Sequence, residues 1–358
     1  MKVLVAMSGG VDSSVAAALV RDAGHDVVGV TMKLWGGESD TGCCSASDVD
    51  DARRVAHQLG IDHHVFNFTQ EFDEHVVDPY VEAWRTGVTP NPCIECNRHL
   101  KFDTLVERAE ALGFDAIATG HHARIVANVA PSGDPKARLR RGADRAKDQS
   151  YVLYPIVAGP LDRILFPVGH LTKVDVRRMA AERGLRTAGK TDSQDVCFIS
   201  AGAGRATFLG DRIPLHRGSV VDGSGLTVGE VDAVEMVTVG QRRGVGSAGG
   251  SAPRYVVDVD VEAAKVTVGH RSELLRDVIE LRDVVWAAEP ATSDALAQTS
   301  AHGTPRPARV IVGDGRVRLE WAEPQVRVAP GQSVVLYDGD AVIGGGLAAR
   351  SPDRDLNR

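Results

Sequence analysis

Strand-like and helix-like segments alternate along the first 120 residues, and this alternation constrains the fold more than any other feature of the chain. The β-rich runs Lys2–Met7 and Val27–Met32 precede segments of helical character at Ser13–Ala23 and Asp48–Leu59, and Ser47 is a suitable N-cap for the second. The series continues with His64–Phe68, Asn97–Leu112 and Ala116–Thr119. Because parallel strands are usually joined by helices, the sequence predicts an α/β fold with a doubly wound parallel sheet.

After about Arg205 the pattern changes to short strands separated by tight turns. Hairpin-like pairs occur around residues 220–228, 309–321 and 333–343, and this spacing is typical of a small β-barrel or sandwich. Residues 243–254 and 287–307 are rich in Gly, Ala, Ser and Pro and are predicted to be loops or linkers. The sequence therefore predicts an α/β domain at 1–204, a small central domain at 205–275 and a C-terminal β-barrel at 276–358.

The composition is that of a soluble globular protein, with 43% hydrophobic and 25% charged residues. No apolar run approaches the roughly 20 residues of a membrane helix, and the N-terminus lacks the pattern of a secretion signal. These features predict a cytoplasmic protein that does not bind membranes. The net charge of -7 argues mildly against a nucleic-acid partner, although a local basic face is sufficient for one. Five cysteines in a chain of this size indicate metal binding, thiol chemistry or burial rather than a disulfide framework.

A run of glycines and serines, Ser8-Gly9-Gly10-Val11-Asp12-Ser13-Ser14, follows the first expected strand. Glycines there let the backbone approach an anion, and the N–H groups of the following helix attract phosphate. The Walker Lys-Ser/Thr pair and a G-x-G-x-x-G fingerprint are both missing. The alternative interpretation is a Gly-Ser turn that only caps a helix. The coincidence of strand, paired glycines, Asp and serines at the first βα turn favours phosphate binding.

This run resembles the SGGxDS loop of the pyrophosphate-loop ATPases, which cleave ATP between its α and β phosphates to adenylate a substrate oxygen. The resemblance implies ATP binding by Ala6, Met7, Ser8, Gly9, Gly10, Val11, Asp12 and Ser13. Ligands of such sheets lie outside the carboxyl ends of the strands, which adds Met32 near the adenine and Gly120 near the nucleotide. Mg²⁺ is expected with the triphosphate, and Asp12 is the expected protein contact for it.

Two cysteines are candidates for thiol chemistry. Cys96 lies near the start of the expected helix Asn97–Leu112, close to Arg98 and Lys101, and both influences favour a thiolate. Cys197 precedes Phe-Ile and is equally consistent with a small buried hydrophobic residue.

Later blocks of sequence point to one family. They are Pro-x-x-x-Cys-Asn-x-x-x-Lys-Phe from Pro92, Ala118-Thr119-Gly120-His121-His122, Lys147-Asp148-Gln149-Ser150-Tyr151, Phe166-Pro167-Val168-Gly169, Ser193-Gln194-Asp195-Val196-Cys197-Phe198-Ile199 and Gly240-Gln241-Arg242-Arg243-Gly244. From Met1 to about Gly346 the series resembles the bacterial tRNA-specific 2-thiouridylase family, MnmA. The resemblance implies that ATP adenylates the C2 oxygen of the wobble uridine of tRNA and that sulfur then replaces it, giving 2-thiouridine, AMP and pyrophosphate.

The resemblance also implies a role for each matching residue. Cys197 would accept sulfur as a persulfide from a cysteine desulfurase or a sulfur-relay protein, and Cys96 would help to release it, leaving a Cys96–Cys197 disulfide. The implied tRNA contacts are Asn91, Pro92, Cys93, His121, Lys147, Asp148, Gln149 and Gln332, the last in the barrel that binds tRNA. His121 alone is also consistent with a buried histidine at a strand end. The basic cluster between Lys136 and Lys147 is either a solvated charged loop or a contact for the RNA backbone.

One position departs from the family, because Cys93 stands where many members carry an Asp that is a proposed acid/base group. The change creates Cys93-x-x-Cys96, which together with Cys197 could hold an iron–sulfur cluster with one iron left open. We favour the persulfide route over cluster-dependent thiolation. The sequence is also compatible with another adenylating ligase of the pyrophosphate-loop superfamily and with a tRNA-binding protein without catalysis. Cys43 and Cys44 are expected to be structural.

Overall fold

The computed structural model describes residues 1–35, 45–129, 135–192, 196–199, 204–245 and 253–350, and these form two compact units. The first unit comprises Met1–Val76, Pro92–Gly202 and Gly339–Ile343. The second comprises Val77–Asn91, Ala203–Asp338 and Gly344–Arg358. The pair Cys43-Cys44 and the start of the second cysteine block, Ser193–Asp195, lie outside the described residues.

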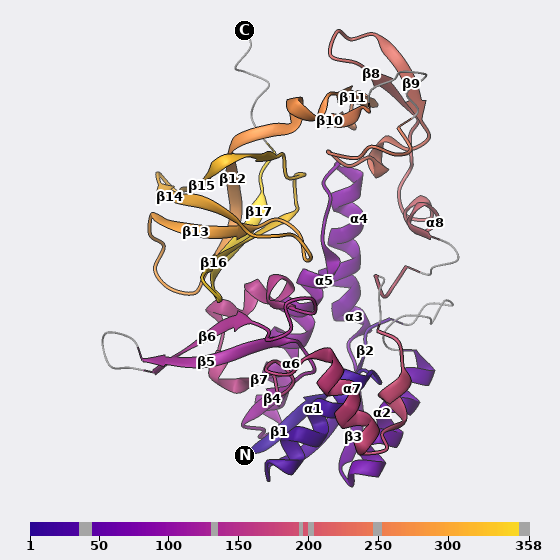
Figure 1. Cartoon of the computed structure of the whole chain (residues 1–358). Helices are drawn as coiled ribbons and strands as arrows, with labels where there is room; N and C mark the ends of the chain where they lie inside the picture. Colours follow the sequence, from indigo (N-terminus) through magenta and orange to yellow (C-terminus); the bar gives the residue numbers. More distant parts are fainter. Residues whose placement is uncertain (36–44, 130–134, 193–195, 200–203, 246–252, 351–358) are drawn as a thin grey trace. The chain divides into compact units, whose positions relative to one another are not determined.

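A parallel five-stranded sheet forms the centre of the first unit (Figure 1). Its strands, in spatial order, are β3 (Asp62–Asn67), β2 (Asp26–Lys33), β1 (Lys2–Ala6), β4 (Ala116–Ala118) and β7 (Ile164–Leu165). The chain moves outward from β1 to β3 and then returns to place β4 on the other side of β1. The predicted α/β fold with a doubly wound parallel sheet is confirmed. The strand order reverses between β1 and β4, which is where such folds bind ligands.

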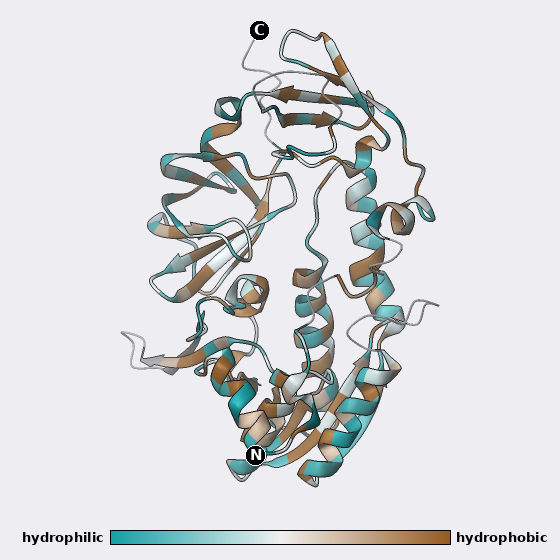
Figure 2. Ribbon diagram, turned by 45° about the vertical axis from the view of Figure 1, so that its right-hand side comes forward, coloured by the Kyte–Doolittle hydropathy of each residue, from teal (hydrophilic) through white to brown (hydrophobic). Residues whose placement is uncertain are grey.

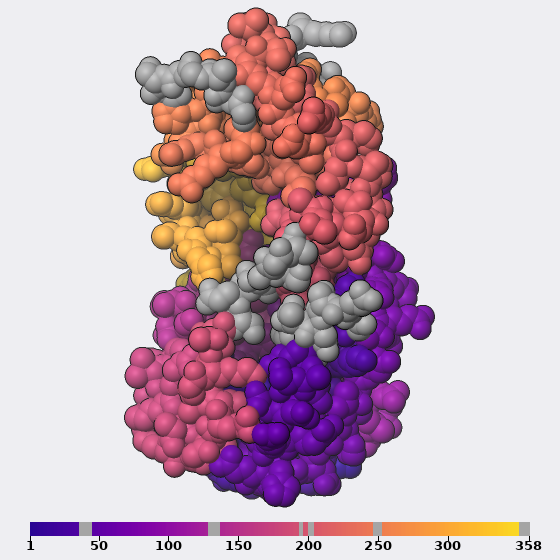
Figure 3. Space-filling model, turned by 90° about the vertical axis from the view of Figure 1, so that its right-hand side faces the viewer, coloured from indigo at the N-terminus to yellow at the C-terminus, as the bar shows by residue number. Residues whose placement is uncertain are grey.

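Three helices pack around the first strands: α1 (Val11–Asp22), α2 (Ala46–Leu59) and α7 (Lys173–Glu182). Val3 and Val5 of β1 and Val15 of α1 are completely buried, and each such side chain contributes about 1.5–3 kcal/mol. Figure 2 shows the strands largely in brown and the outer faces of these helices largely in teal. In Figure 3 the pink residues of α7 lie directly against the indigo N-terminal segment. The prediction that Ser47 caps α2 is wrong, because Ser45 Oγ accepts the cap bond from the Asp48 amide at 3.2 Å.

A continuous helical run starts earlier than the sequence suggests. It consists of α5 (Pro92–Glu95), the π-helix η2 (Cys96–Thr104) and α6 (Leu105–Ala111). Proline suits the first turn of a helix because its missing N–H would have no partner there. The expected start at Asn97 was therefore wrong, and Cys96 lies one turn inside the run. Before it come α3 (Thr69–Phe72), the π-helix η1 (Asp73–Val77) and α4 (Asp78–Arg85).

The segment that carries the basic cluster contains a strand, so the alternative of a solvated charged loop does not hold for most of it. β5 (Ala123–Val129) and β6 (Pro135–Arg141) pair antiparallel, so much of the basic cluster lies on β6. Asp340 accepts ion pairs from Arg124 at 3.1 Å and from Arg145 at 2.5 Å. Beyond β6, the buried 3-10 segment η3 (Ser150–Ala158) is followed by η4 (Leu161–Arg163), and η5 (Arg186–Gly189) follows α7.

The second unit contains a small sheet and a barrel. The small sheet, β10-β11-β8-β9, is built from β8 (Gly218–Val221), β9 (Thr227–Val231), β10 (Tyr255–Asp260) and β11 (Lys265–Gly269). The barrel strands are β12 (Leu275–Trp286), β13 (Ser293–Gln298), β14 (Arg306–Gly313), β15 (Arg316–Val326), β16 (Ser333–Asp338) and β17 (Ala341–Ala348). The barrel closes because β12 pairs with both β15 and β17. The short helices of this unit are α8 (Gly204–Gly210), η6 (Val234–Met236) and η7 (Arg271–Leu274).

The predicted linker at 287–307 is wrong, because β13 crosses it and pairs with both β14 and β16. Its Ala-rich sequence has a weak intrinsic preference for strand, and pairing on both edges overrides that preference. No helix in the described part of the chain is long and apolar enough to cross a membrane.

Candidate active site

The glycine- and serine-rich loop joins β1 to α1, with Gly10 as the helix N-cap. Gly9 has a φ of 71°, and a Cβ there would lie 2.3 Å from the carbonyl oxygen of Asp48. Ser14 Oγ donates to Gly10 O at 2.7 Å, and Ser13 Oγ donates to the same oxygen at 3.1 Å. The loop is therefore held tightly, and it leaves the first backbone N–H groups of α1 for an anion.

Gly120, two residues after the end of β4, lies against this loop. A Cβ on Gly120 would be 2.5 Å from Ser13 N and 2.7 Å from Asp12 C, so only glycine fits. Met32, near the end of β2, is buried, and the strand lies beside β1. The structure thus gathers the predicted nucleotide residues at the carboxyl edge of neighbouring strands, where the strand order reverses.

Asp12, in the first turn of α1, has two side-chain partners, His122 and Lys173. His122 Nε2 lies 3.1 Å from Asp12 Oδ1, and Lys173 Nζ lies 2.8 and 2.6 Å from the two carboxylate oxygens. Burial by itself would raise the pKa of Asp12, but the hydrogen bonds from His122 and Lys173 outweigh it, and the pKa is lowered. Asp12 is therefore an ionised carboxylate beside the phosphate loop.

Lys173 also links this loop to the segment that carries Cys197. Its Nζ lies 2.8 Å from Asp192 Oδ1. Asp192 also forms ion pairs with Lys147 at 2.8 Å and with Arg177 at 2.9 Å. Burial opposes ionisation of Asp192, yet the bonds from Lys147 and Lys173 lower its pKa to about 2. Lys173 thus bridges two carboxylates, with its own side chain only 10% exposed.

Several residues predicted to contact tRNA are engaged within the protein. His121 is buried and lies 2.7 Å from Thr119 Oγ1 through Nδ1, and burial followed by the nearby charges of Lys101 and His122 holds its pKa well below the usual range. His121 therefore carries a neutral imidazole. Its burial matches the alternative interpretation from the sequence, although a role toward tRNA stays a prediction.

Residues 147–149, also predicted to contact tRNA, likewise interact with other residues of the protein. Asp148 pairs with Arg141 at 3.0 Å, and Gln149 Oε1 accepts a hydrogen bond from the His122 amide at 2.8 Å. The side chain of Lys147 is 40% exposed, whereas that of Asp148 is 5% exposed. In the second unit, Gln332 Nε2 donates to Thr89 O at 2.9 Å.

The two candidate cysteines lie on segments that share one neighbour. Phe198, next to Cys197, packs on Phe72 of α3 with ring centroids 5.6 Å apart. One turn later, His75 stacks on His99 of η2 at 4.9 Å, and η2 begins at Cys96. Cys96 is buried, with 7% exposed, and Cys197 is half-buried. The same stretch of chain therefore positions the segments of both thiols.

The other residues predicted to contact tRNA lie at the start of the helical run that α5, η2 and α6 form. Pro92 is buried in α5, whereas Cys93, the next residue, is exposed, and Asn91 directly precedes the helix. The structure leaves the roles of Asn91, Pro92 and Cys93 toward the target base as predictions.

Sequence reasoning missed His122, Lys173 and Asp192 as members of this network. A signal existed for Lys173, because a lysine at the first position of a helix opposes the helix dipole and needs compensating carboxylates. Asp12 contacts Lys173 although 161 positions separate the two along the chain, so no local pattern in the sequence reveals that Lys173 joins Asp12 to Asp192.

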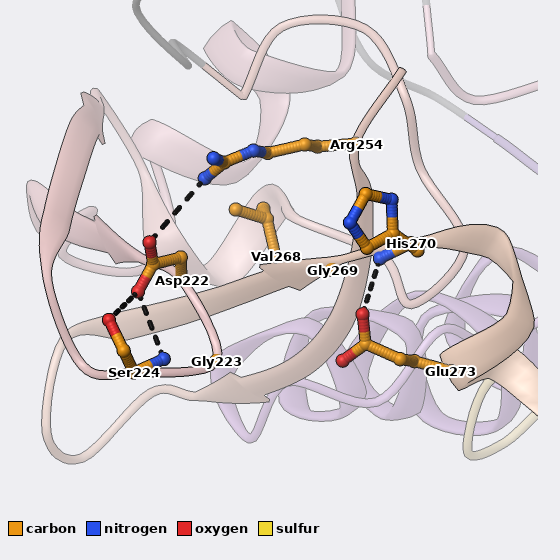
Figure 4. Close-up of a pocket in the computed structure, with 8 residues that line it drawn as sticks. All are labelled: Asp222, Gly223, Ser224, Arg254, Val268, Gly269, His270 and Glu273. Atoms are coloured by element: carbon orange, nitrogen blue, oxygen red, sulfur yellow. Dashed lines mark hydrogen bonds and ion pairs between the residues drawn. The ribbon is translucent and has the colours of Figure 1, made fainter. Parts of the chain in front are cut away.

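A separate pocket of about 250 Å³ lies in the second unit (Figure 4). It lies between the β8–β9 turn and the start of η7. Asp222 accepts bonds from Ser224 and lies 3.9 Å from Arg254, while Glu273 accepts from the His270 amide at 2.6 Å. Most of its polar groups are occupied in holding a turn and a helix cap, so we assign it a structural role.

Comparisons with known proteins identify the family. A family model described as tRNA methyl transferase HUP domain matches residues 1–201, and models described as tRNA methyl transferase PRC-barrel domain and aminomethyltransferase beta-barrel domain match 206–270 and 276–348. A curated protein from Roseiflexus sp. (strain RS-1), named tRNA-specific 2-thiouridylase MnmA, is 46% identical and covers 98% of this chain and 99% of its own length. The chain belongs to the MnmA family.

Other MnmA relatives are equally similar. Proteins of the same name from Chloroflexus aurantiacus and Mycolicibacterium smegmatis are each 47% identical, covering 97% and 98% of this chain and 98% and 100% of their own lengths. Among solved structures, an NMN synthetase from Francisella tularensis covers 54% of this chain and 66% of its own, with 16% identity and a TM-score of 0.33, a likeness too slight to bear on function.

The site of this MnmA-family chain has features that suit the phosphates of ATP. Gly9 and Gly120 let the loop pack closely against the backbone of Asp48 and of the segment after β4, and the N–H groups at the start of α1 are suited to bind phosphates. Among the described residues, no group of three or more Cys, His, Asp or Glu side chains is arranged to hold a metal ion.

Proposed function

We propose that this chain uses ATP to replace the C2 oxygen of the wobble uridine of tRNA with sulfur, giving 2-thiouridine, AMP and pyrophosphate. Relatives that carry the name tRNA-specific 2-thiouridylase match it at 46–47% identity along nearly the full chain. The observation that carries the proposal is the contact of Gly120 with the phosphate loop at the switch point of the sheet. Neither cluster-dependent thiolation nor the activity of another ligase is favoured.

The first chemical step needs a triphosphate held beside the uridine. The N–H groups at the start of α1 would bind its phosphates, and Asp12 would contact Mg²⁺. Lys173, now bound to the carboxylate of Asp12, would then lie beside the phosphates and offset their charge. The uridine O2 attacks the α-phosphorus, pyrophosphate leaves, and the poor leaving group at C2 becomes AMP. The base must leave the anticodon stack to reach this point.

The second step transfers sulfur. A persulfide on Cys197 attacks C2 and displaces AMP, which takes the original oxygen with it. The thiolate of Cys96 then attacks Cys197 Sγ, so that the terminal sulfur stays on the base and a Cys96–Cys197 disulfide forms. The contacts of Phe72 with Phe198 and of His75 with His99 support the approach of the two segments that this exchange requires.

The partners follow from this chemistry. The tRNA would be held through Lys147, Asp148 and Gln149 in the first unit and through Gln332 in the second. A cysteine desulfurase or a sulfur-relay protein would load Cys197 with sulfur. These assignments rest on the family resemblance, and they remain proposals.

The direct experiment is mass analysis of tRNA nucleosides after incubation of the protein with ATP, Mg²⁺ and a persulfide source. We expect 2-thiouridine, together with AMP in equal amount, and a loss of both 2-thiouridine and turnover in Cys197→Ser. The matched control omits ATP or replaces it with an analogue that cannot be cleaved between the α and β phosphates. Full activity in both Cys96→Ser and Cys197→Ser would contradict the sulfur-transfer mechanism and favour a ligase.

A further inference from the structure

Cys93 and Cys96 occupy successive turns of one helical run and differ sharply in exposure. Cys93 is exposed in α5, whereas Cys96, the first residue of η2, is 7% exposed. Glu95, between the two elements, has helical angles of φ -67° and ψ -38°, so the run is continuous across the junction. Residues three apart in a helix lie on the same face.

We propose that Cys93 is the resolving thiol of this chain, which attacks the Cys96–Cys197 disulfide at Cys96 and carries the oxidised state to the surface. The inference rests on the proposed function, because sulfur transfer is what forms that disulfide. The Cys93 thiolate forms a bond to Cys96 Sγ, the Cys96–Cys197 bond breaks, and Cys197 leaves as a thiolate. No net electrons are consumed in this exchange. A dithiol reductant then supplies two electrons to the Cys93–Cys96 disulfide and restores all three thiols.

The geometry of the helix suits this exchange. Cβ atoms three residues apart lie about 5–6 Å from each other, and a disulfide needs about 3.5–4.5 Å. The bond therefore requires an approach of only about 1–2 Å. Cys93 belongs to the first turn of the run, where the dipole of the helix favours a thiolate.

Burial explains why a third thiol is useful. Reductants act by direct attack on sulfur, so a disulfide between buried Cys96 and half-buried Cys197 reacts slowly with a bulky protein dithiol. Transfer to Cys93 brings the same two oxidising equivalents to an exposed atom. It also frees Cys197, the sulfur acceptor, before any reductant arrives.

The experiment maps disulfides after a single turnover. Persulfide-loaded protein is mixed with ATP and tRNA without reductant, quenched in acid, alkylated, digested and analysed by mass spectrometry. The result is expressed as moles of each disulfide per mole of 2-thiouridine, which makes it independent of rate. In the unaltered chain we expect Cys93–Cys96 to predominate, with Cys197 alkylated. In Cys93→Ser we expect Cys96–Cys197 to accumulate instead.

A second measurement uses the oxidised protein alone and needs no tRNA. Reduction of the single disulfide by a protein dithiol with a C-x-x-C motif should be at least tenfold slower in Cys93→Ser than in the unaltered chain, while a small phosphine should reduce both at similar rates. A Cys96–Cys197 disulfide as the main product in the unaltered chain would overturn the inference while leaving the proposed function intact. Absence of 2-thiouridine in the unaltered chain would instead refute the proposed function and the inference with it.

Discussion

Replacing Lys173 with methionine tests whether its ammonium holds the phosphate loop in a state that can bind ATP. The side chain keeps its length and loses its charge, so the carboxylates of Asp12 and Asp192 lose a shared partner. Both carboxylates are bonded to the same Nζ at distances of 2.8 Å or less, so they remain within about 6 Å of each other. At an effective dielectric constant of about 20, two unit charges at that distance repel by about 3 kcal/mol.

The net loss is smaller than this repulsion, because other partners remain. Asp12 keeps His122, and Asp192 keeps Lys147 and Arg177. We therefore expect the free energy of unfolding to fall by about 1–3 kcal/mol at pH 7. The uncompensated carboxylates should also repel the triphosphate and weaken ATP binding at least tenfold, which corresponds to about 1.4 kcal/mol.

Lys190→Met is a matched control. Lys190 also bridges two carboxylates, Asp48 at 2.6 Å and Asp51 at 2.8 Å, but these lie on α2 and its side chain is 32% exposed. Solvent screens that cluster more strongly, so we expect a loss of about 1 kcal/mol or less and unchanged ATP affinity. Urea denaturation and calorimetric titration with ATP measure both quantities.

The pH dependence of the stability of Lys173→Met is an independent test. Without Lys173, burial and the nearby charge of Asp192 act to raise the pKa of Asp12, so the variant's deficit should shrink as the pH falls from 7 toward 4. A variant that binds ATP normally, with a stability within about 0.5 kcal/mol of the unaltered chain, would refute the role given to Lys173.

Three further outcomes are expected. The pKa of Asp192 in the folded state is about 2, below its unfolded value of 3.8. Asp192→Asn should therefore lose about 2 kcal/mol of stability above pH 4, and this loss should vanish as the pH falls through about 2. Acid titrations of the stability of both proteins measure the difference. Gly120→Ala drives a Cβ to 2.5 Å from Ser13 N and should weaken ATP binding more than tenfold, whereas Gly189→Ala, which meets nothing within 4 Å, should not; equal affinities would contradict the close contact. Phe198→Ala should cost about 3–5 kcal/mol and speed alkylation of the adjacent cysteine, so an unchanged alkylation rate would show that this packing does not position the thiol.

Local patterns were sufficient for the phosphate loop and its sheet. The alternation of strands and helices depends on periodicities of two and 3.6 residues, which any short window of sequence records. The loop was recognisable because glycine, serine and Asp must be adjacent to cradle an anion there. The fold class and the hairpins at β8–β9 and β14–β15 were therefore predicted correctly from the sequence alone.

Other elements were not predicted because their structure depends on the strands that pair with them. β13 has an Ala-rich sequence that favours no state, and it is a strand only because β14 and β16 pair with both of its edges. The strand β6 in the basic segment was not predicted, since its pairing with β5 is not recorded in the local pattern of charges.

The active site divides in the same way. The sequence by itself determined the adjacent residues: the loop from Ser8 to Ser14, the cysteine pair three residues apart, and the family to which these blocks belong. Only the tertiary structure decided that Lys173 joins Asp12 to Asp192 and that Gly120 closes on the loop. The reason is physical, because the energy of an ion pair or a close contact depends on distance in space, and separation along the chain does not encode that distance.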